Sequence, residues 1–587
     1  MQKDPERQIK DAISPSKLMR YTSDLSRWVR LSGSEEEGYA FDYLEAILKG
    51  FGLTVQRDRH DALISWPGEA ALEVTAPARN TIRCITHSFA ASTPPGGLDT
   101  EVVAVGAGYR GAQMRGKVAL VDGLAMPGPT RLAEHAGALG IIFINPAHLY
   151  ESIVSTVWGS PTPEAMGMLP KVVAVSVSQT DGAALRAHAQ NGTLRVNIRA
   201  AVDTRWRKTP ILIADLAGHE TDRFILFSGH VDSWYHGSMD NGSANAVMVE
   251  LARIFSRRRA RLRRGIRFAF WSGHSHGRYS GSSWYADQYW QELYQRAVLH
   301  LNIDSPGGKG ATVLSEAPTM AETWALAARG IRDVTGQELQ QRRLRHNADQ
   351  SFWGIGVPSM FSDLSTQPPA EGAGDESGGA TLHHRLGWWW HTVDDTIDKV
   401  DRANLHRDAQ VYALVLWWWC TAPVLPLDYR ETVAELREVL RGLQAAAGDA
   451  FDMAPPLDAL DRLAAATERL AVAMEHIRAI PGRGTRRQRA AAAAINDALM
   501  QLGRTLIPVT YTAAGPFDHD PAAPVPAIPG LQSAAQLGAL APGSDERKAL
   551  HVRLIRERNK LVHAINTAIE SVDRTVDRTR GLDRARV

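Results

Sequence analysis

The stretch from Phe224 to Phe255 constrains the fold of this chain most, because it joins two different hydrophobic periodicities around a polar loop. It begins with the uninterrupted apolar run FILF, which is typical of a buried parallel strand. It ends with Val247, Leu251 and Ile254 at the spacing of one helix face. A strand, a loop and a helix in this order predict an α/β fold, in which ligands bind at the carboxyl ends of the strands.

The loop inside this stretch carries His230, Asp232, His236 and Asp240. Imidazole and carboxylate groups are good ligands for divalent metal ions. Residues 240–243, DNGS, also have the composition of a turn that caps the following helix. This loop alone therefore leaves both interpretations open.

Two further strand candidates also end in residues of the metal-binding type. The run GIRFAFWSG leads to His274 and His276, and the run AVLHLNID ends at Asp304. Together with His230 and Asp232, they place such residues after three successive strands. Helix capping explains this recurrence less well than it explains any one loop, so the pattern favours a metal site.

Length and composition limit the class of protein. A chain of 587 residues is too long for one hydrophobic core and suggests about three or four domains. The net charge of +2 gives no electrostatic case for nucleic acid or membrane as a partner. The N-terminus lacks a signal-peptide core, and Cys84 and Cys420 have neither metal-binding nor redox spacing. We therefore expect a cytoplasmic protein with two buried thiols.

The predicted secondary structure divides the chain into four segments. Residues 1–62 suggest helix followed by strand, and residues 63–205 consist of short β-rich runs with one helix near residues 130–140. Residues 206–425 return to the α/β pattern. Residues 426–587 are mainly helical and predict an antiparallel bundle. Its helices are expected near residues 430–447, 457–478, 486–505 and 545–575.

Four motifs together resemble family-28 metallopeptidases, in the branch of glutamate carboxypeptidase II and the transferrin receptor. They are SGHVDSW with DNGSANAVMVELAR, RFAFWSG with GSSWYAD, LNIDSPGG, and WWWHTVDDTIDKVD. Matching segments run through most of the chain in the family's order. The resemblance implies a zinc-peptidase-like mixed sheet flanked by helices, an inserted β-rich protease-associated domain and a C-terminal helical dimerisation domain.

The resemblance also implies two zinc ions that share one carboxylate and a water or hydroxide. His230, Asp240 and Asp304 would hold one ion, and Asp240 as the bridge would hold part of the second together with His391. Asp232 would orient the His230 ring. Neutral imidazoles and carboxylates are suitable zinc ligands, and two cations lower the pKa of a bridging water.

The chain departs from the family after Trp271, where members carry two adjacent glutamates, a general base and a metal ligand. Here the sequence reads GHSHGRYSGS. If the two sequences are aligned forward from Trp271, His274 replaces the base and Ser275 replaces the ligand. If they are aligned backward from the Gly-Ser pair at 281–282, Ser275 replaces the base and His276 replaces the ligand. Alternate positions of an extended segment share a face, so both histidines could point at the metals. We predict His274, His276 and Asp232 as catalytic groups and His276 as a further ligand.

These residues predict a metallohydrolase that cleaves a peptide or amide bond in a small substrate; the resemblance implies two zinc ions, and another divalent metal is possible. The helical C-terminal segment predicts a homodimer. The alternatives are an inactive binding or scaffold protein and a metal-dependent amidohydrolase that is not a peptidase. Arg385 could bind a substrate carboxylate through a bidentate pair, and Trp390 could line the pocket beside His391. A structural role for each of these two side chains is also open.

Overall fold

The structure is a computed structural model that describes residues 4–105, 113–192, 194–369, 385–480 and 484–579. Its centre is a mixed sheet in which neighbouring strands follow the order β12, β11, β9, β10, β8. β9, β11 and β12 are parallel to one another, β10 is parallel to β9, and β8 is antiparallel to β10. These strands are β12 (Ser359–Met360), β11 (Ala297–Asn302), β9 (Phe224–His230), β10 (Gly265–Trp271) and β8 (Arg195–Leu216).

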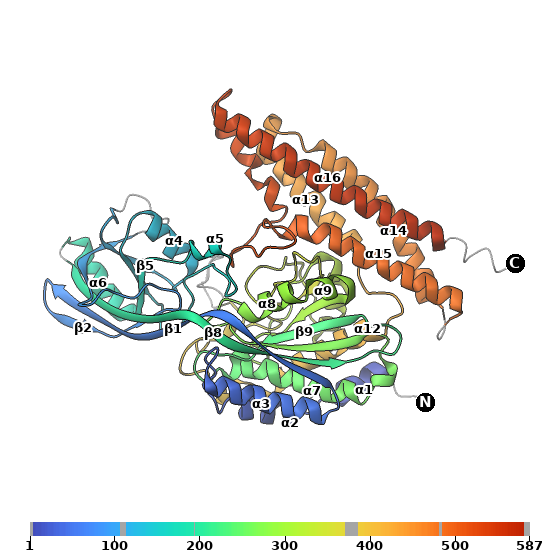
Figure 1. Cartoon of the computed structure of the whole chain (residues 1–587), viewed down its shortest axis with the longest axis horizontal. Helices are drawn as coiled ribbons and strands as arrows, with labels where there is room; N and C mark the ends of the chain where they lie inside the picture. The colour runs from blue at the N-terminus through green and yellow to red at the C-terminus, as the bar shows by residue number, and fades with distance from the viewer. Residues whose placement is uncertain (1–3, 106–112, 193, 370–384, 481–483, 580–587) are drawn as a thin grey trace.

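Helices cover both faces of this sheet, as strands that are buried on both sides require. Every residue of β9, β10 and β11 is buried. Figure 1 shows α2, α3 and α7 on one face and α8 and α9 on the other. The helices are α2 (Pro15–Leu25), α3 (Glu35–Gly50), α7 (Ala244–Ser256), α8 (Ser280–Gln288) and α9 (Trp290–Arg296). The α/β class predicted from the sequence is confirmed.

Two long strands connect the central sheet to a second region (Figure 1). β1 (Thr54–Ala76) pairs antiparallel with β8 from Thr54 opposite Asp215 to Ala76 opposite Arg195. The divisions predicted near residues 62 and 205 fall inside these strands. The inserted region is therefore an outward continuation of the same ladder.

The inserted region contains more helix than the sequence suggested. α4 (Pro127–His135) lies where one helix was expected, but α5 (Pro163–Met166) and α6 (Gln179–Gln190) are also present. Its strands β5, β6 and β7 are parallel, and parallel neighbours require crossover connections. α4 lies in the connection from β5 to β6, and α5 lies in the connection from β6 to β7. These strands are β5 (Val118–Asp122), β6 (Gly140–Ile144) and β7 (Val173–Val177).

The C-terminal helices form a separate layer, confirming the helical segments predicted there (Figure 1). They are α13 (Tyr429–Ala447), α14 (Ala454–Arg478), α15 (Arg486–Tyr511) and α16 (Asp545–Thr579). Arg504 on α15 joins this layer to the sheet region, donating hydrogen bonds to the carbonyl oxygens of Gly356 and Leu293. In the described part of the chain no helix is long and apolar enough to cross a membrane. Cys84 and Cys420 are free and buried, as expected.

The core of the central sheet gives a stability prediction. Phe227 on β9 is fully buried, with its ring centre 5.9 Å from Phe268 and 5.7 Å from Tyr412. We expect Phe227→Ala to lower the free energy of unfolding by about 3–5 kcal/mol, because it leaves a cavity. Chemical denaturation followed by circular dichroism measures this. Leu132→Ala, at a side chain 50% exposed on α4, should change it by less than about 0.5 kcal/mol. Equal losses in the two variants would contradict the assigned core.

Candidate metal centre

The carboxylate of Asp240 lies between two histidines at the carboxyl edge of the sheet. One of its oxygens, Oδ1, is 3.2 Å from Nε2 of His230, and the other, Oδ2, is 3.1 Å from Nε2 of His391. His230 is the last residue of β9, and Asp240 belongs to the buried turn Ser238–Ser243 that leads into α7. Each oxygen therefore faces its own imidazole, which is the arrangement of a carboxylate that can bridge two ligand sets.

Asp304 completes the group around His230. It follows β11, and its Oδ2 lies 3.5 Å from Nε2 of His230. His230 Nε2 and Asp240 Oδ1 are both buried, and neither has a partner in good hydrogen-bond geometry. Two facing, unsatisfied ligand atoms with a second carboxylate beside them fit a divalent cation, because an ion would satisfy all three.

Electrostatics at this position also favour a cation. Burial lowers the pKa of His230, but the charges and hydrogen bonds of Asp304 and Asp240 outweigh it and raise that pKa well above its usual range. Burial alone would raise the pKa of Asp240, yet its contacts with His230 and His391 hold it far below its usual range. The carboxylates therefore stabilise positive charge at this position, which a divalent ion would supply.

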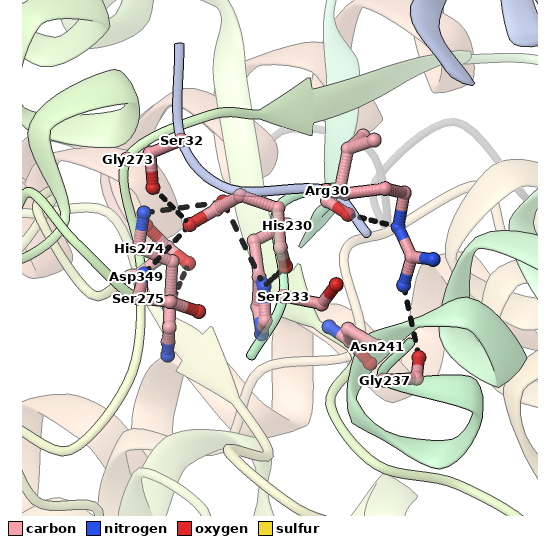
Figure 2. Close-up of polar contacts among 12 residues, drawn as sticks. Arg30, Ser32, His230, Ser233, Gly237, Asn241, Gly273, His274, Ser275 and Asp349 are labelled. Carbon is pink, nitrogen blue, oxygen red and sulfur yellow. Dashed lines mark hydrogen bonds and ion pairs between the residues drawn. The ribbon is translucent and has the colours of Figure 1, made fainter. Parts of the chain in front are cut away.

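The backbone of Asp232 fixes the ring of His230. Nδ1 of His230 lies 2.8 Å from the carbonyl oxygen of Asp232, and because a carbonyl can only accept, Nδ1 carries the proton and Nε2 is free. The Asp232 carboxylate is farther away, at 3.8 Å. It accepts hydrogen bonds from Ser32 Oγ at 2.7 Å and from the backbone N–H groups of His274 at 3.2 Å and Ser275 at 2.7 Å (Figure 2).

The inserted region holds the second histidine. Nδ1 of His391 donates to the carbonyl oxygen of Glu151 at 2.9 Å, and the Glu151 N–H donates to the His391 carbonyl oxygen at 3.0 Å. The ring of Trp390 stacks on His391 with centres 3.5 Å apart. Trp390 therefore supports the imidazole directly. This contact favours a structural role for Trp390 over the pocket-lining role that was also predicted.

Two residues that position the loop were not singled out from the sequence. Asp395 accepts the backbone N–H groups of Met239 at 2.9 Å and Asp240 at 3.0 Å. Burial and the nearby charge of Asp240 raise its pKa to about 7, against the effect of those N–H groups. The buried guanidinium of Arg30 donates to the carbonyl oxygens of Val231 and Gly237 (Figure 2). Asp395 lies inside the WWWHTVDDTIDKVD motif, but no spacing rule distinguishes it from Asp394.

His274 lies directly against His230. The two rings are nearly parallel, 8° apart, with centres separated by 3.8 Å, and ligand atoms of His230, His274 and Asp304 lie within 4.8 Å of one another. Proximity alone makes His274 a third candidate ligand. The direction of its lone pair argues otherwise, because that lone pair lies in the ring plane and zinc sits about 2.1 Å from nitrogen. One ion cannot lie in the planes of two stacked rings, so we favour His274 as a neighbour of the ion.

Asp349 holds the other nitrogen of His274. Nδ1 of His274 is 2.8 Å from Oδ2 of Asp349, and Ser282 Oγ donates to the other oxygen at 2.7 Å. Asp349 is 1% exposed. Burial tends to raise its pKa, but His274 lowers it below its usual range, so this buried group stays a carboxylate.

His276 points elsewhere. Its Nδ1 lies 3.1 Å from Ser32 Oγ, and its ring packs on Trp234 with centres 4.1 Å apart, leaving Nε2 buried without a partner. Burial and the charges of His391 and Arg207 lower its pKa to about 3, so the ring is neutral. The expectation of an extended segment does not hold, because Gly273 has φ of 78° and residues 275–277 form a turn. The two histidines therefore do not share one face.

Arg385 is already paired with residues outside the proposed ligand set. Its Nη1 pairs with Glu316 at 2.5 Å, and its Nη2 donates to Thr366 Oγ1 at 2.8 Å. A substrate carboxylate would have to displace Glu316, so the predicted substrate-binding role receives no support from this geometry.

Comparison with known proteins places the fold. Residues 212–416 match the profile of peptidase family M28. The probable glutamate carboxypeptidase VP8 of Zea mays is 23% identical over 496 residues, covering 71% of this chain and 68% of that protein. Two mammalian aminopeptidases are matched over only 20% and 34% of their own length.

Solved structures agree on the architecture. An aminopeptidase from Aneurinibacillus sp. strain AM-1 aligns with 21% identity and a TM-score of 0.53, covering 71% of this chain and 96% of that one. A zinc aminopeptidase from Bacillus subtilis aligns with 20% identity and a TM-score of 0.53, covering 69% and 95%. At these identities the likeness establishes the fold, a mixed α/β sheet with flanking helices.

The donor set predicts metal content. Protein purified without chelator should contain divalent metal, and His230→Ala and Asp240→Ala should each lower its content at least about tenfold, because each removes a ligand. Elemental analysis by mass spectrometry measures this directly. His563→Ala, on the exposed surface of α16, is the matched control and should keep the wild-type content. Metal-free wild-type protein that also fails to take up added zinc would contradict the site.

Proposed function

We propose that this chain, in which residues 212–416 match peptidase family M28, is a zinc-dependent hydrolase that cleaves a peptide or amide bond in a small substrate. The observation that carries the proposal is the Asp240 carboxylate placed between His230 and His391. A bound zinc ion would polarise the substrate carbonyl and lower the pKa of the attacking water. His230, Asp240 and Asp304 would hold one ion. The second oxygen of Asp240 and His391 would hold part of a second.

His274 is the group best placed to move a proton. Its Nδ1 is bound to the buried carboxylate of Asp349, so the proton stays on that nitrogen and Nε2 can accept another. The ring stacks on His230, which places Nε2 near the proposed reaction centre. In this proposal an imidazole oriented by a carboxylate does the work of the family's glutamate base. His276 is neutral and is held by Ser32 and Trp234. It would shape the site without transferring a proton or contacting the bond that is cut.

The same geometry disfavours an inactive scaffold. A protein that only presents a surface does not need facing, unsatisfied ligand atoms in its interior, since such atoms cost stability. An amidohydrolase that is not a peptidase would use the same groups and differ only in its substrate. A substrate panel therefore has to include both peptides and simple amides.

We also propose that the C-terminal helices mediate a homodimer. α14 and α16 leave apolar side chains in solvent, Val472 at 71% and Val552 at 48% exposure. Light scattering should give twice the chain mass of 64.2 kDa, and Val472→Glu with Val552→Glu should shift the protein toward the monomer. A monomer mass for the wild type at micromolar concentration would refute this proposal.

The role of His274 and Asp349 gives the activity prediction. On a panel of aminoacyl anilides, dipeptides and acyl amides, His274→Ala should lower kcat/KM by about 10²–10⁴-fold, because it removes the proton acceptor. Asp349→Asn should lower it by about 10–100-fold, because it loosens the ring's orientation. Metal content should be unchanged in both. His563→Ala is the control, and undiminished turnover in the His274 and Asp349 variants would rule out the proposed pair.

A further inference from the structure

The side chain of Arg278 lies one residue from a ring that touches the proposed proton acceptor. The ring centre of Tyr279 is 4.9 Å from that of His274 in an edge-on contact. The guanidinium carbon of Arg278 is 5.2 Å from the same Tyr279 ring centre. The sum of these two distances is an upper limit for the separation between the guanidinium and the His274 ring. That limit equals the length of about two or three residues of extended chain.

This guanidinium has no counter-charge. Nη2 of Arg278 donates to the carbonyl oxygen of Ala522 at 2.8 Å, and Nε is buried without a hydrogen-bond partner. Within the described ranges, no carboxylate oxygen lies within 4.0 Å of it. Arg385 differs, because Glu316 already neutralises it. A partly buried cation without a charged partner is costly, and the planar guanidinium is suited to binding a carboxylate through two hydrogen bonds.

Backbone contacts from two distant segments hold Arg278 in place. The N–H of Gly159, from the inserted region, donates to the Arg278 carbonyl oxygen at 3.2 Å. Ala522, from the C-terminal region, donates its N–H to the carbonyl oxygen of Thr156 at 2.9 Å and accepts the Arg278 side chain. Arg278 thus sits where three parts of the chain meet. Its position is set by backbone hydrogen bonds, which a surface arginine would not need.

A cluster of buried aromatic rings packs beside Arg278. The ring of Trp158 lies 4.9 Å from Tyr279, 5.3 Å from His519 and 6.2 Å from His346, centre to centre. Trp158, Tyr279 and Ala522 form one buried apolar cluster. These buried rings give the guanidinium a rigid support, and a guanidinium held in this way without a counter-charge can orient a small ligand by a single charged group.

We infer that Arg278 binds a free carboxylate of the substrate, within about two or three residues of the bond that is cut. This inference rests on the proposed hydrolase function and narrows it to short peptides or acylated amino acids that keep a terminal carboxylate. Arg278 is a specificity-determining residue in this account. It does not contact the reacting atoms.

Matched pairs of dipeptides test this, each pair differing only in a C-terminal carboxylate or carboxamide. Wild-type protein should hydrolyse the carboxylate member with at least about tenfold higher kcat/KM, the difference expected for one charge-assisted pair. Arg278→Gln and Arg278→Ala should bring the ratio close to one, and Arg278→Lys should give an intermediate ratio. Arg430→Ala is the control, because Arg430 pairs with Asp428 on the helical layer, and it should keep the wild-type ratio.

A ratio near one in the wild type, or a ratio that survives in Arg278→Gln, would overturn the inference while leaving hydrolysis intact. If no pair is cleaved, the proposed function fails for peptides, and binding decides the inference. The same dipeptides are then tested by thermal shift with zinc-loaded protein. If only the carboxylate member raises the melting temperature, and Arg278→Gln abolishes that rise, carboxylate binding by Arg278 is upheld. Equal shifts for both members would overturn it.

Discussion

The buried carboxylate of Asp232 is the constraint on which the rest of the site depends. It is fully buried, and it accepts hydrogen bonds from Ser32 Oγ and from the backbone of His274 and Ser275, while its own carbonyl oxygen holds His230 (Figure 2). A buried charge is tolerated only when its hydrogen bonds are satisfied. The N-terminal loop, the loop after β9 and the loop after β10 are thereby locked together.

The buried guanidinium of Arg30 supplies positive charge near the carboxylates of the site. Burial lowers the pKa of Arg30 to about 10, against the opposing charges of Asp395, Asp232 and Asp240. Its donors bind carbonyl oxygens, so its charge acts at a distance and leaves the carboxylate oxygens free. The ligand atoms of Asp240 therefore remain available for an ion, which is the property that a metal site requires.

Sequence periodicity predicted that His230 and Asp304 would converge because parallel strands end at one edge of a sheet, and β9 and β11 are parallel neighbours. The family resemblance supplied Asp240 as the bridging ligand. Periodicity could not assign His274 and His276. Alternation holds for extended chain, and here a glycine with positive φ begins a turn that sends one ring to Asp349 and the other to Ser32.

Contacts between segments distant in sequence could not be predicted either. No local spacing indicates that Arg385 pairs with Glu316 or that Arg278 has no carboxylate partner.

The most direct measurement of the central claim is anomalous X-ray scattering at the zinc absorption edge from crystals grown with zinc. We expect a peak within bonding distance of His230 Nε2 and Asp240 Oδ1. No peak at that position, with the two atoms still facing each other as they do here, would contradict the account.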